Sequence, residues 1–170
     1  MELRQGMTRR PGAVTADRGS LMVLRGAYVV GLLVAVTATR VLPAAAIQPP
    51  ALAWWLGLVF VCSGIAIRLW SFLALGRYFT FTVQTSMDQL VISDGPYRLL
   101  RHPGYTGLLL TLTGFGFVFG NWVSAVGLAL VMTVGFVYRI GVEERALLQT
   151  LGDRYRDYAA TRKRLVPLIW

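Results

Sequence analysis

Two charged residues near position 140 have the type and spacing that chemistry would need. Arg139 and Glu143 stand four residues apart, so on a helix they lie on the same face. A guanidinium offers a planar fork that fits a carboxylate, and a carboxylate accepts hydrogen bonds from hydroxyl or amino donors, such as those of a ribose and its base. The pair could therefore bind two different polar ligands. The alternative is an ion pair at the level of lipid headgroups.

Glu144 adds a second carboxylate directly after Glu143. It points about 100° away around a helix, so it does not share the face of Arg139 and Glu143. Two roles are open for it: assisting a positively charged ligand, or supporting a neighbouring loop.

A polar interval at residues 94–107 lies between long apolar runs and contains the single histidine, His102. Proline disfavours helix for the residue before it, so Pro103 places His102 where a helix does not continue. Pro103 also suits the first position of a following helix, and Gly104 allows backbone or ligand to come close. A helix start beside a histidine and arginines favours anion binding. The alternative is an ordinary loop between membrane helices.

The composition is that of a membrane protein. The 170 residues are 55% hydrophobic and 15% charged, which is not the balance of a soluble domain. The net charge of +9 does not indicate nucleic acid, because the arginines lie at the ends of apolar runs and not in one stripe with interleaved aromatics. One cysteine, Cys62, and one histidine predict neither a disulfide within the chain nor a metal site.

Four apolar runs predict about four transmembrane helices and an all-α integral membrane fold. The first two are long enough to cross roughly 30 Å of hydrocarbon. Gly120 and Asn121 suit a tight reversal between the last two. Arg68 lies inside the second run, and its role is open between reaching the interface and facing the polar loop. The runs are residues 21–42, 51–75, 104–119 and 122–142.

The ends of the chain complete the predicted organisation. Residues 1–20 hold four arginines without an apolar period and predict a basic arm, and residues 21–170 predict a single membrane domain. A cleaved signal peptide is the alternative for the first run, but that run is longer than a usual signal core. Residues 143–164 predict an amphipathic helix that packs over the polar loop through one stripe. The stripe consists of Leu147, Leu148, Leu151, Tyr155 and Tyr158.

The distribution of basic residues predicts the orientation. The arm, the loop at residues 76–103 and the tail after residue 140 hold nearly all of the lysine and arginine, whereas residues 43–50 and 120–121 hold none. The positive-inside rule therefore predicts both termini and the loop in the cytosol, with the protein multi-pass in the plasma (inner) membrane. Loop and tail can then meet in one cytosolic site.

Five motifs in order resemble the isoprenylcysteine carboxyl methyltransferase family of integral-membrane enzymes, and more loosely the phospholipid N-methyltransferases. The resemblance covers residues 84–167, roughly the C-terminal half, with an apolar hairpin between the second and third motifs. Two departures stand out: Gln89 occupies a position where a histidine is common, and Arg162 with Lys163 replaces a usual Val-Pro. The motifs are GPY at 95–97, RHPGYTG at 101–107, RIGVEE at 139–144, GDRYRDY at 152–158 and RLVP at 164–167.

The resemblance implies S-adenosylmethionine as cofactor and assigns the site residues. Arg139 would face the methyl acceptor, and Glu144 is a second candidate for a catalytic role. No metal is implied. The cofactor would contact Gln84, Gln89, Leu90, Val91, Ile92, Tyr97, His102, Pro103, Gly104, Tyr105 and Glu143.

The expected activity is methyl transfer at the membrane to the carboxylate of a lipophilic small molecule such as isoprenylcysteine. A carboxylate is already ionised at neutral pH and needs no base, whereas an amine acceptor would need one and would gain nothing from Arg139. The bilayer is the expected partner and nucleic acid is not. The alternatives are a phospholipid or other small-lipid methyltransferase, a non-catalytic membrane module, and a reductase, for which no Gly-x-Gly-x-x-Gly motif follows a strand. The oligomeric state and the acceptor's identity stay open.

Overall fold

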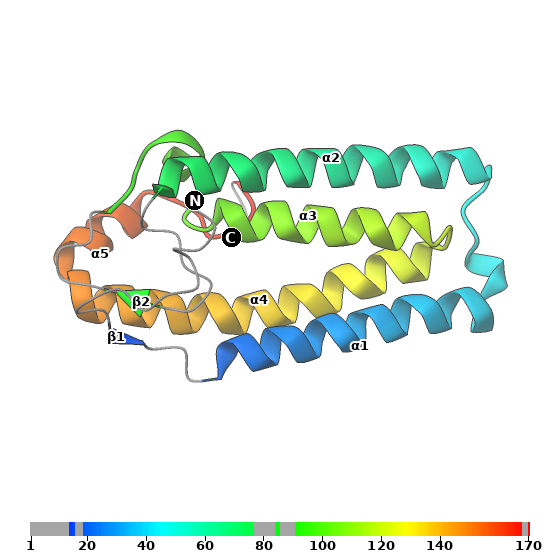
Figure 1. Ribbon diagram of the computed structural model, residues 1–170, viewed down its shortest axis with the longest axis horizontal. Helices are drawn as coiled ribbons and strands as arrows, with labels where there is room; N and C mark the ends of the chain where they lie inside the picture. The colour runs from blue at the N-terminus through cyan, green and yellow to red at the C-terminus, as the bar shows by residue number, and fades with distance from the viewer. Residues whose placement is uncertain (1–13, 16–18, 77–83, 86–90, 168–169) are drawn as a thin grey trace.

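The computed structural model describes residues 14–15, 19–76, 84–85, 91–167 and 170. Four long helices form its body and lie side by side in the order α2, α3, α4, α1 (Figure 1). Short elements connect them, and two-residue strands β1 and β2 pair antiparallel. The long helices are α1 (Ser20–Val41), α2 (Pro50–Leu75), α3 (Pro103–Val118) and α4 (Trp122–Leu151). The short elements are β1 (Val14–Thr15), η2 (Pro43–Ala45), β2 (Gln84–Thr85), η4 (Gly95–Arg98) and α5 (Asp153–Ala160).

The all-α membrane prediction is confirmed, with one difference in the length of the helices. Within the described residues, α1, α2 and α4 are long and apolar enough to cross a membrane. The third predicted span is α3, which has 16 residues. At 1.5 Å per residue it is about 24 Å long, less than the roughly 30 Å of hydrocarbon. It lies along α2 and forms a hairpin with α4.

Small residues bring α2 and α3 into close contact. A Cβ atom at Gly64 would lie 2.4 Å from Oγ1 of Thr111, and one at Gly107 would lie 2.6 Å from the carbonyl oxygen of Gly64. Such distances leave no room for a side chain, so the two backbones touch, as small residues allow in membrane helices. This contact fixes the position at which α3 begins, and therefore the position of His102.

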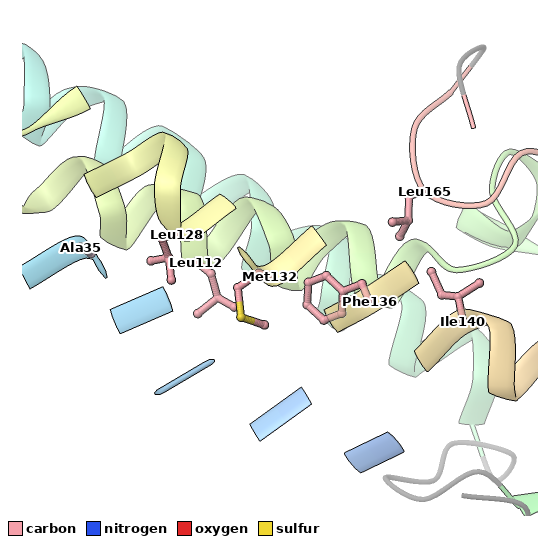
Figure 2. Packing of buried hydrophobic residues seen from close by; sticks show 7 residues of the cluster. All are labelled: Ala35, Leu112, Leu128, Met132, Phe136, Ile140 and Leu165. Carbon is pink, nitrogen blue, oxygen red and sulfur yellow. The ribbon is translucent and has the colours of Figure 1, made fainter. Parts of the chain in front are cut away.

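The main apolar cluster lies between α1, α3 and α4. Phe136 and Met132 on α4 are buried against Leu112 on α3 and Ala35 on α1. Leu165, from the chain after α5, closes the cluster near Ile140 (Figure 2). The end of the chain is thereby packed against the last turns of the membrane helices.

The chain after residue 142 differs from the expected single helix over residues 143–164. Helix α4 continues without a break to Leu151, because the apolar period runs through this boundary. It ends at Gly152, whose φ of +57° suits glycine, and α5 follows directly. Residues 162–165 are not helical, and they run beside residues 100–102. Leu151, Tyr155 and Tyr158 are buried as the predicted stripe requires, whereas Leu148 is exposed.

Candidate active site

The last residues of the chain fasten the loop that carries the histidine. The backbone N–H of Arg101 donates to the carbonyl of Lys163 at 2.8 Å, and that of His102 donates to the carbonyl of Arg164 at 3.0 Å. The hydroxyl of Thr106 donates to the carbonyl of Leu165 at 2.7 Å. Hydrogen bonds therefore join two segments about 60 residues apart in sequence at the start of α3.

His102 stands outside the helix, as the proline after it predicts. Its φ and ψ are −128° and 55°, and Pro103 is the first residue of α3. Its carbonyl accepts from the N–H groups of Tyr105 and Thr106 and so begins the helix. The imidazole is buried, with 5% exposure, and its Nε2 lies 3.3 Å from Oε1 of Glu144. The same backbone geometry that excludes His102 from the helix directs its ring toward α4.

Glu144 is the centre of a cluster of basic groups. Nη1 of Arg101 donates to Oε1 at 2.8 Å, on the same oxygen that faces His102. Nε of Arg164 donates to Oε2 at 2.9 Å, and Nη2 of the same guanidinium lies 2.9 Å from the same oxygen. Glu144 is 7% exposed, and its hydrogen bonds raise the pKa of Arg164 above its usual value. We call Glu144 and these three partners the Glu144 cluster.

Arg139 and Glu143 meet at the hydroxyl of Tyr105, which lies in the first turn of α3. Nε of Arg139 donates to this oxygen at 3.2 Å, and the hydroxyl donates to Oε2 of Glu143 at 2.9 Å. On its other side, Nη1 of Arg139 donates to Oγ of Ser20 at 2.6 Å. Arg139 is 3% exposed. We call Ser20, Arg139, Tyr105 and Glu143 the Tyr105 network.

Two more predicted cofactor residues lie near this network. The carbonyl of Tyr97, in η4, accepts from the hydroxyl of Tyr158 at 3.0 Å, so α5 holds η4 in place. Burial raises the pKa of Tyr97, and the charge of Glu143 raises it further, which keeps the phenol neutral and able to donate. Val91 is half-buried against the cluster of Leu151 and Tyr155.

The remaining predicted residues complete the map. Ile92 is half-buried, Gly104 follows Pro103 in the first turn of α3, and Gln84 belongs to β2. Gln89 and Leu90 lie outside the described residues. The structure thus brings together residues 102–105, Arg139, Glu143 and Glu144.

Sequence reasoning did not single out four residues that the structure places at the site. Ser20 was assigned to the basic arm, although it begins α1 and is fully buried. Arg101 and Arg164 were noted within motifs but not paired with Glu144. The hydroxyl of Tyr155 is buried and has no hydrogen-bond partner among the described residues. The regular spacing of Tyr155 and Tyr158 predicted that both are buried, but it could not show which of the two hydroxyls has a hydrogen-bond partner among the described residues.

The structure answers the question that the sequence left open for Arg68: its guanidinium contacts the protein interior. Its Nη1 donates to the carbonyl of Gly104 at 3.1 Å, and its guanidinium lies over the ring of Phe72, 4.7 Å from the centroid. It therefore supports the first turn of α3 from the side of α2.

Comparisons with known proteins agree with these motifs. A family model described as the isoprenylcysteine carboxyl methyltransferase family matches residues 55–149. Protein-S-isoprenylcysteine O-methyltransferase A of Arabidopsis thaliana is 35% identical over 121 residues, covering 68% of this chain and 61% of that protein. The Schizosaccharomyces pombe protein-S-isoprenylcysteine O-methyltransferase is 33% identical over 112 residues, covering 65% of this chain and 48% of that protein.

A solved structure of the eukaryotic intramembrane Ras methyltransferase, an isoprenylcysteine carboxyl methyltransferase, is also similar. Its TM-score is 0.70 at 26% sequence identity, and the match covers 85% of this chain and 52% of that one. The chain therefore spans about half the length of the solved relative and of the fission-yeast protein.

Proposed function

Because the chain belongs to the isoprenylcysteine carboxyl methyltransferase family, we propose that it methylates the carboxylate of a lipophilic acceptor at the membrane. The acceptor class is a prenylated cysteine or a similar lipid-bearing acid, and S-adenosylmethionine is the methyl donor. The observation that carries the proposal is the Tyr105 network, in which one hydroxyl contacts both Arg139 and Glu143. Arg139, which we assign to the acceptor, and Glu143, which we assign to the cofactor, therefore lie next to each other.

Arg139 is the residue we assign to the acceptor's carboxylate. Its guanidinium is buried, where a charge interacts more strongly than it does in water. A planar fork matches a carboxylate and discriminates it from a neutral head group. The carboxylate is ionised at neutral pH, so the site needs no general base. The site contributes by positioning the acceptor and excluding water, which together lower the activation barrier by several kcal/mol.

The residues around Glu143 fit S-adenosylmethionine. When bound, this cofactor supplies a methyl group on a positively charged sulfur. Glu143 is a carboxylate that can accept from ribose hydroxyls, and Val91 and Ile92 offer an apolar surface for a base. The hydroxyl of Tyr155 is buried without a partner among the described residues, which is the condition of a group that a polar ligand completes. Burial and then the charges of Glu144 and Glu143 raise its pKa, so it remains a donor.

Glu144 is better suited to positioning than to contact with the reacting atoms. Its two oxygens are engaged by Arg101, His102 and Arg164. By holding these residues it fixes the loop of residues 100–102 and the start of α3. This supports the second of the two roles that the sequence left open for Glu144.

The orientation of the protein follows the same distribution of charge. We place the end of the bundle that carries the start of α3, α5 and the C-terminal end in the cytosol, since most of the basic residues that the structure describes lie in or next to these segments. The plasma or inner membrane is the proposed location. Reporters placed before residue 21 and after residue 170 should both respond as cytosolic, and reporters on opposite sides would contradict this orientation.

A methyl-transfer assay tests the proposed function. Purified protein in lipid nanodiscs is incubated with S-adenosylmethionine labelled on the methyl group and with prenylated thiols bearing a carboxylate, fatty acids or phosphatidylethanolamine. We expect base-labile methyl esters on the prenylated acids. Label on phosphatidylethanolamine would instead support a phospholipid methyltransferase, and no binding of the cofactor would support a non-catalytic membrane module.

A further inference from the structure

Ser20 joins the first turn of α1 to the candidate active site. Its Oγ accepts from Nη1 of Arg139 at 2.6 Å, a short distance that is typical of a hydrogen bond to a charged donor. Ser20 is fully buried, and Gly19 before it has a φ of +74°, a left-handed conformation that favours glycine. The chain therefore turns directly into α1 at the point where its first side chain meets α4.

Close packing of α1 on α4 holds this contact in register. Gly135 lies one turn before Arg139, and a Cβ atom there would be 2.9 Å from Cβ of Ala27 and 3.4 Å from Cδ1 of Leu24. Leu24 and Ala27 follow Ser20 at i+4 and i+7, on the same face of α1. A side chain at position 135 would push the helices apart. The small residue thus keeps Ser20 within hydrogen-bond distance of Arg139.

Two hydroxyl groups orient the guanidinium of Arg139 from opposite neighbours. Tyr105 on α3 accepts from Nε, and Ser20 on α1 accepts from Nη1. The guanidinium is planar, so contacts to two of its nitrogens determine the orientation of the plane. Both of these acceptors are hydroxyl oxygens, one on α3 and one on α1.

We propose that Ser20 is a positioning residue, which fixes the orientation in which Arg139 receives the acceptor's carboxylate. This inference rests on the proposed function of Arg139. It assigns to α1 a role in acceptor binding that is separate from membrane anchoring, and it leaves cofactor binding to α3, α4 and α5. Loss of the hydroxyl should therefore affect the acceptor and not the cofactor.

The test compares Ser20→Ala with Ser20→Thr, which keeps the hydroxyl, and with Ser124→Ala as a matched control. Ser124 is also fully buried between α1 and α4, where its hydroxyl donates to the carbonyl of Ala35 at 2.7 Å. It lies 15 positions from Arg139, about 22 Å along α4. Both alanine variants lose a buried hydrogen bond between the same helices, but only Ser20→Ala loses one to Arg139.

We expect Ser20→Ala to lower kcat/KM for the acceptor by about 10-fold, the low end for losing a charge-assisted hydrogen bond. The Kd of S-adenosylmethionine should stay unchanged, Ser20→Thr should recover most of the activity, and Ser124→Ala should match the unmodified protein. Equal kcat/KM in Ser20→Ala and Ser124→Ala would overturn the inference.

A spectroscopic readout keeps the inference testable if no methyl acceptor is found. The Nε–H signal of Arg139 in protein labelled with ¹⁵N-arginine is assigned by its disappearance in Arg139→Lys. Ser20→Ala should shift this signal and speed its exchange with water, whereas Ser124→Ala should leave it in place. An unchanged signal in Ser20→Ala overturns the positioning role, while an inactive unmodified protein overturns only the proposed function.

Discussion

Glu143 and Glu144 are neighbours in the chain, yet their carboxylates are held in opposite ways. Glu144 faces two arginines and a histidine that between them occupy both oxygens. Within the part of the chain that the structure describes, Glu143 accepts from one neutral hydroxyl, that of Tyr105, and it is less deeply buried. A rotation of about 100° around one helix therefore separates a carboxylate that joins the loop to the tail from one that is suited to a ligand.

Removing the carboxylate of Glu144 should have the largest effect. Glu144→Ala leaves three basic groups without their common partner, and breaking a buried ion pair costs about 3–5 kcal/mol. The free energy of unfolding, measured by denaturant titration in detergent micelles, should fall by roughly 3 kcal/mol. Asp153→Ala is the control, because Asp153 pairs with Arg156 on the surface, where both side chains are at least 70% exposed. Equal losses of unfolding free energy in Glu144→Ala and Asp153→Ala would contradict the structural role of Glu144.

Removing the carboxylate of Glu143 should instead affect ligand binding. Glu143→Ala is expected to weaken S-adenosylmethionine binding by roughly 10-fold or more, since a hydrogen bond to a charged group contributes about 1.5–3 kcal/mol. Isothermal calorimetry measures the affinity, and the free energy of unfolding should change far less than in Glu144→Ala. An unchanged affinity in a folded variant would exclude Glu143 from the cofactor site.

Replacing His102 should combine the two effects that are expected separately for Glu144 and Glu143. Its ring faces Glu144, and its backbone begins the helix that carries Tyr105. His102→Ala should therefore lower stability and cofactor affinity together, by less than the loss of Glu144 lowers stability. Calorimetry and denaturant titration on the same preparation measure the two effects. A loss of affinity alone would indicate direct contact with the cofactor.

The smallest expected effect concerns Tyr158, whose hydroxyl ties α5 to the loop through the carbonyls of Tyr97 and Leu100. Burial raises the pKa of Tyr158 from 10.0 to about 12. The unfolded chain therefore loses this proton first, so the stabilisation is complete below pH 10 and is lost as the pH rises toward 12. Tyr158→Phe should show a smaller decline in the free energy of unfolding over this range. If the free energy of unfolding declines equally in Tyr158→Phe and in the unmodified protein, Tyr158 does not contribute to this pH dependence.

The sequence predicted the helices well because their cause is local. Apolar runs and prolines at residues 50 and 103 define where α2 and α3 begin, and the observed bounds lie within one residue of those expected. The end of α4 was missed because residues 139–151 change from apolar to amphipathic without leaving the helix. Only Gly152, with its positive φ, ends it.

The contents of the site were predictable only in part. The motifs indicated His102, Tyr105, Arg139 and Glu143, but spacing along a helix cannot reveal a bridge from another helix, and Tyr105 supplies that bridge. The pairing of Arg164 with Glu144 joins residues 20 apart across the end of α4, the whole of α5 and an irregular segment. Such contacts depend on tertiary packing, which no local pattern encodes.

Replacing Arg139 by lysine tests the central claim most directly, because it keeps the positive charge and removes the planar fork. Turnover of the acceptor and cofactor affinity are measured on the same preparation, with Arg139→Ala alongside. If Arg139 binds the acceptor's carboxylate, Arg139→Lys should be strongly impaired in turnover with nearly unchanged cofactor affinity, and Arg139→Ala should be worse. A fully active Arg139→Lys protein would contradict the assignment of Arg139 to the acceptor and, with it, the preference for a carboxyl group.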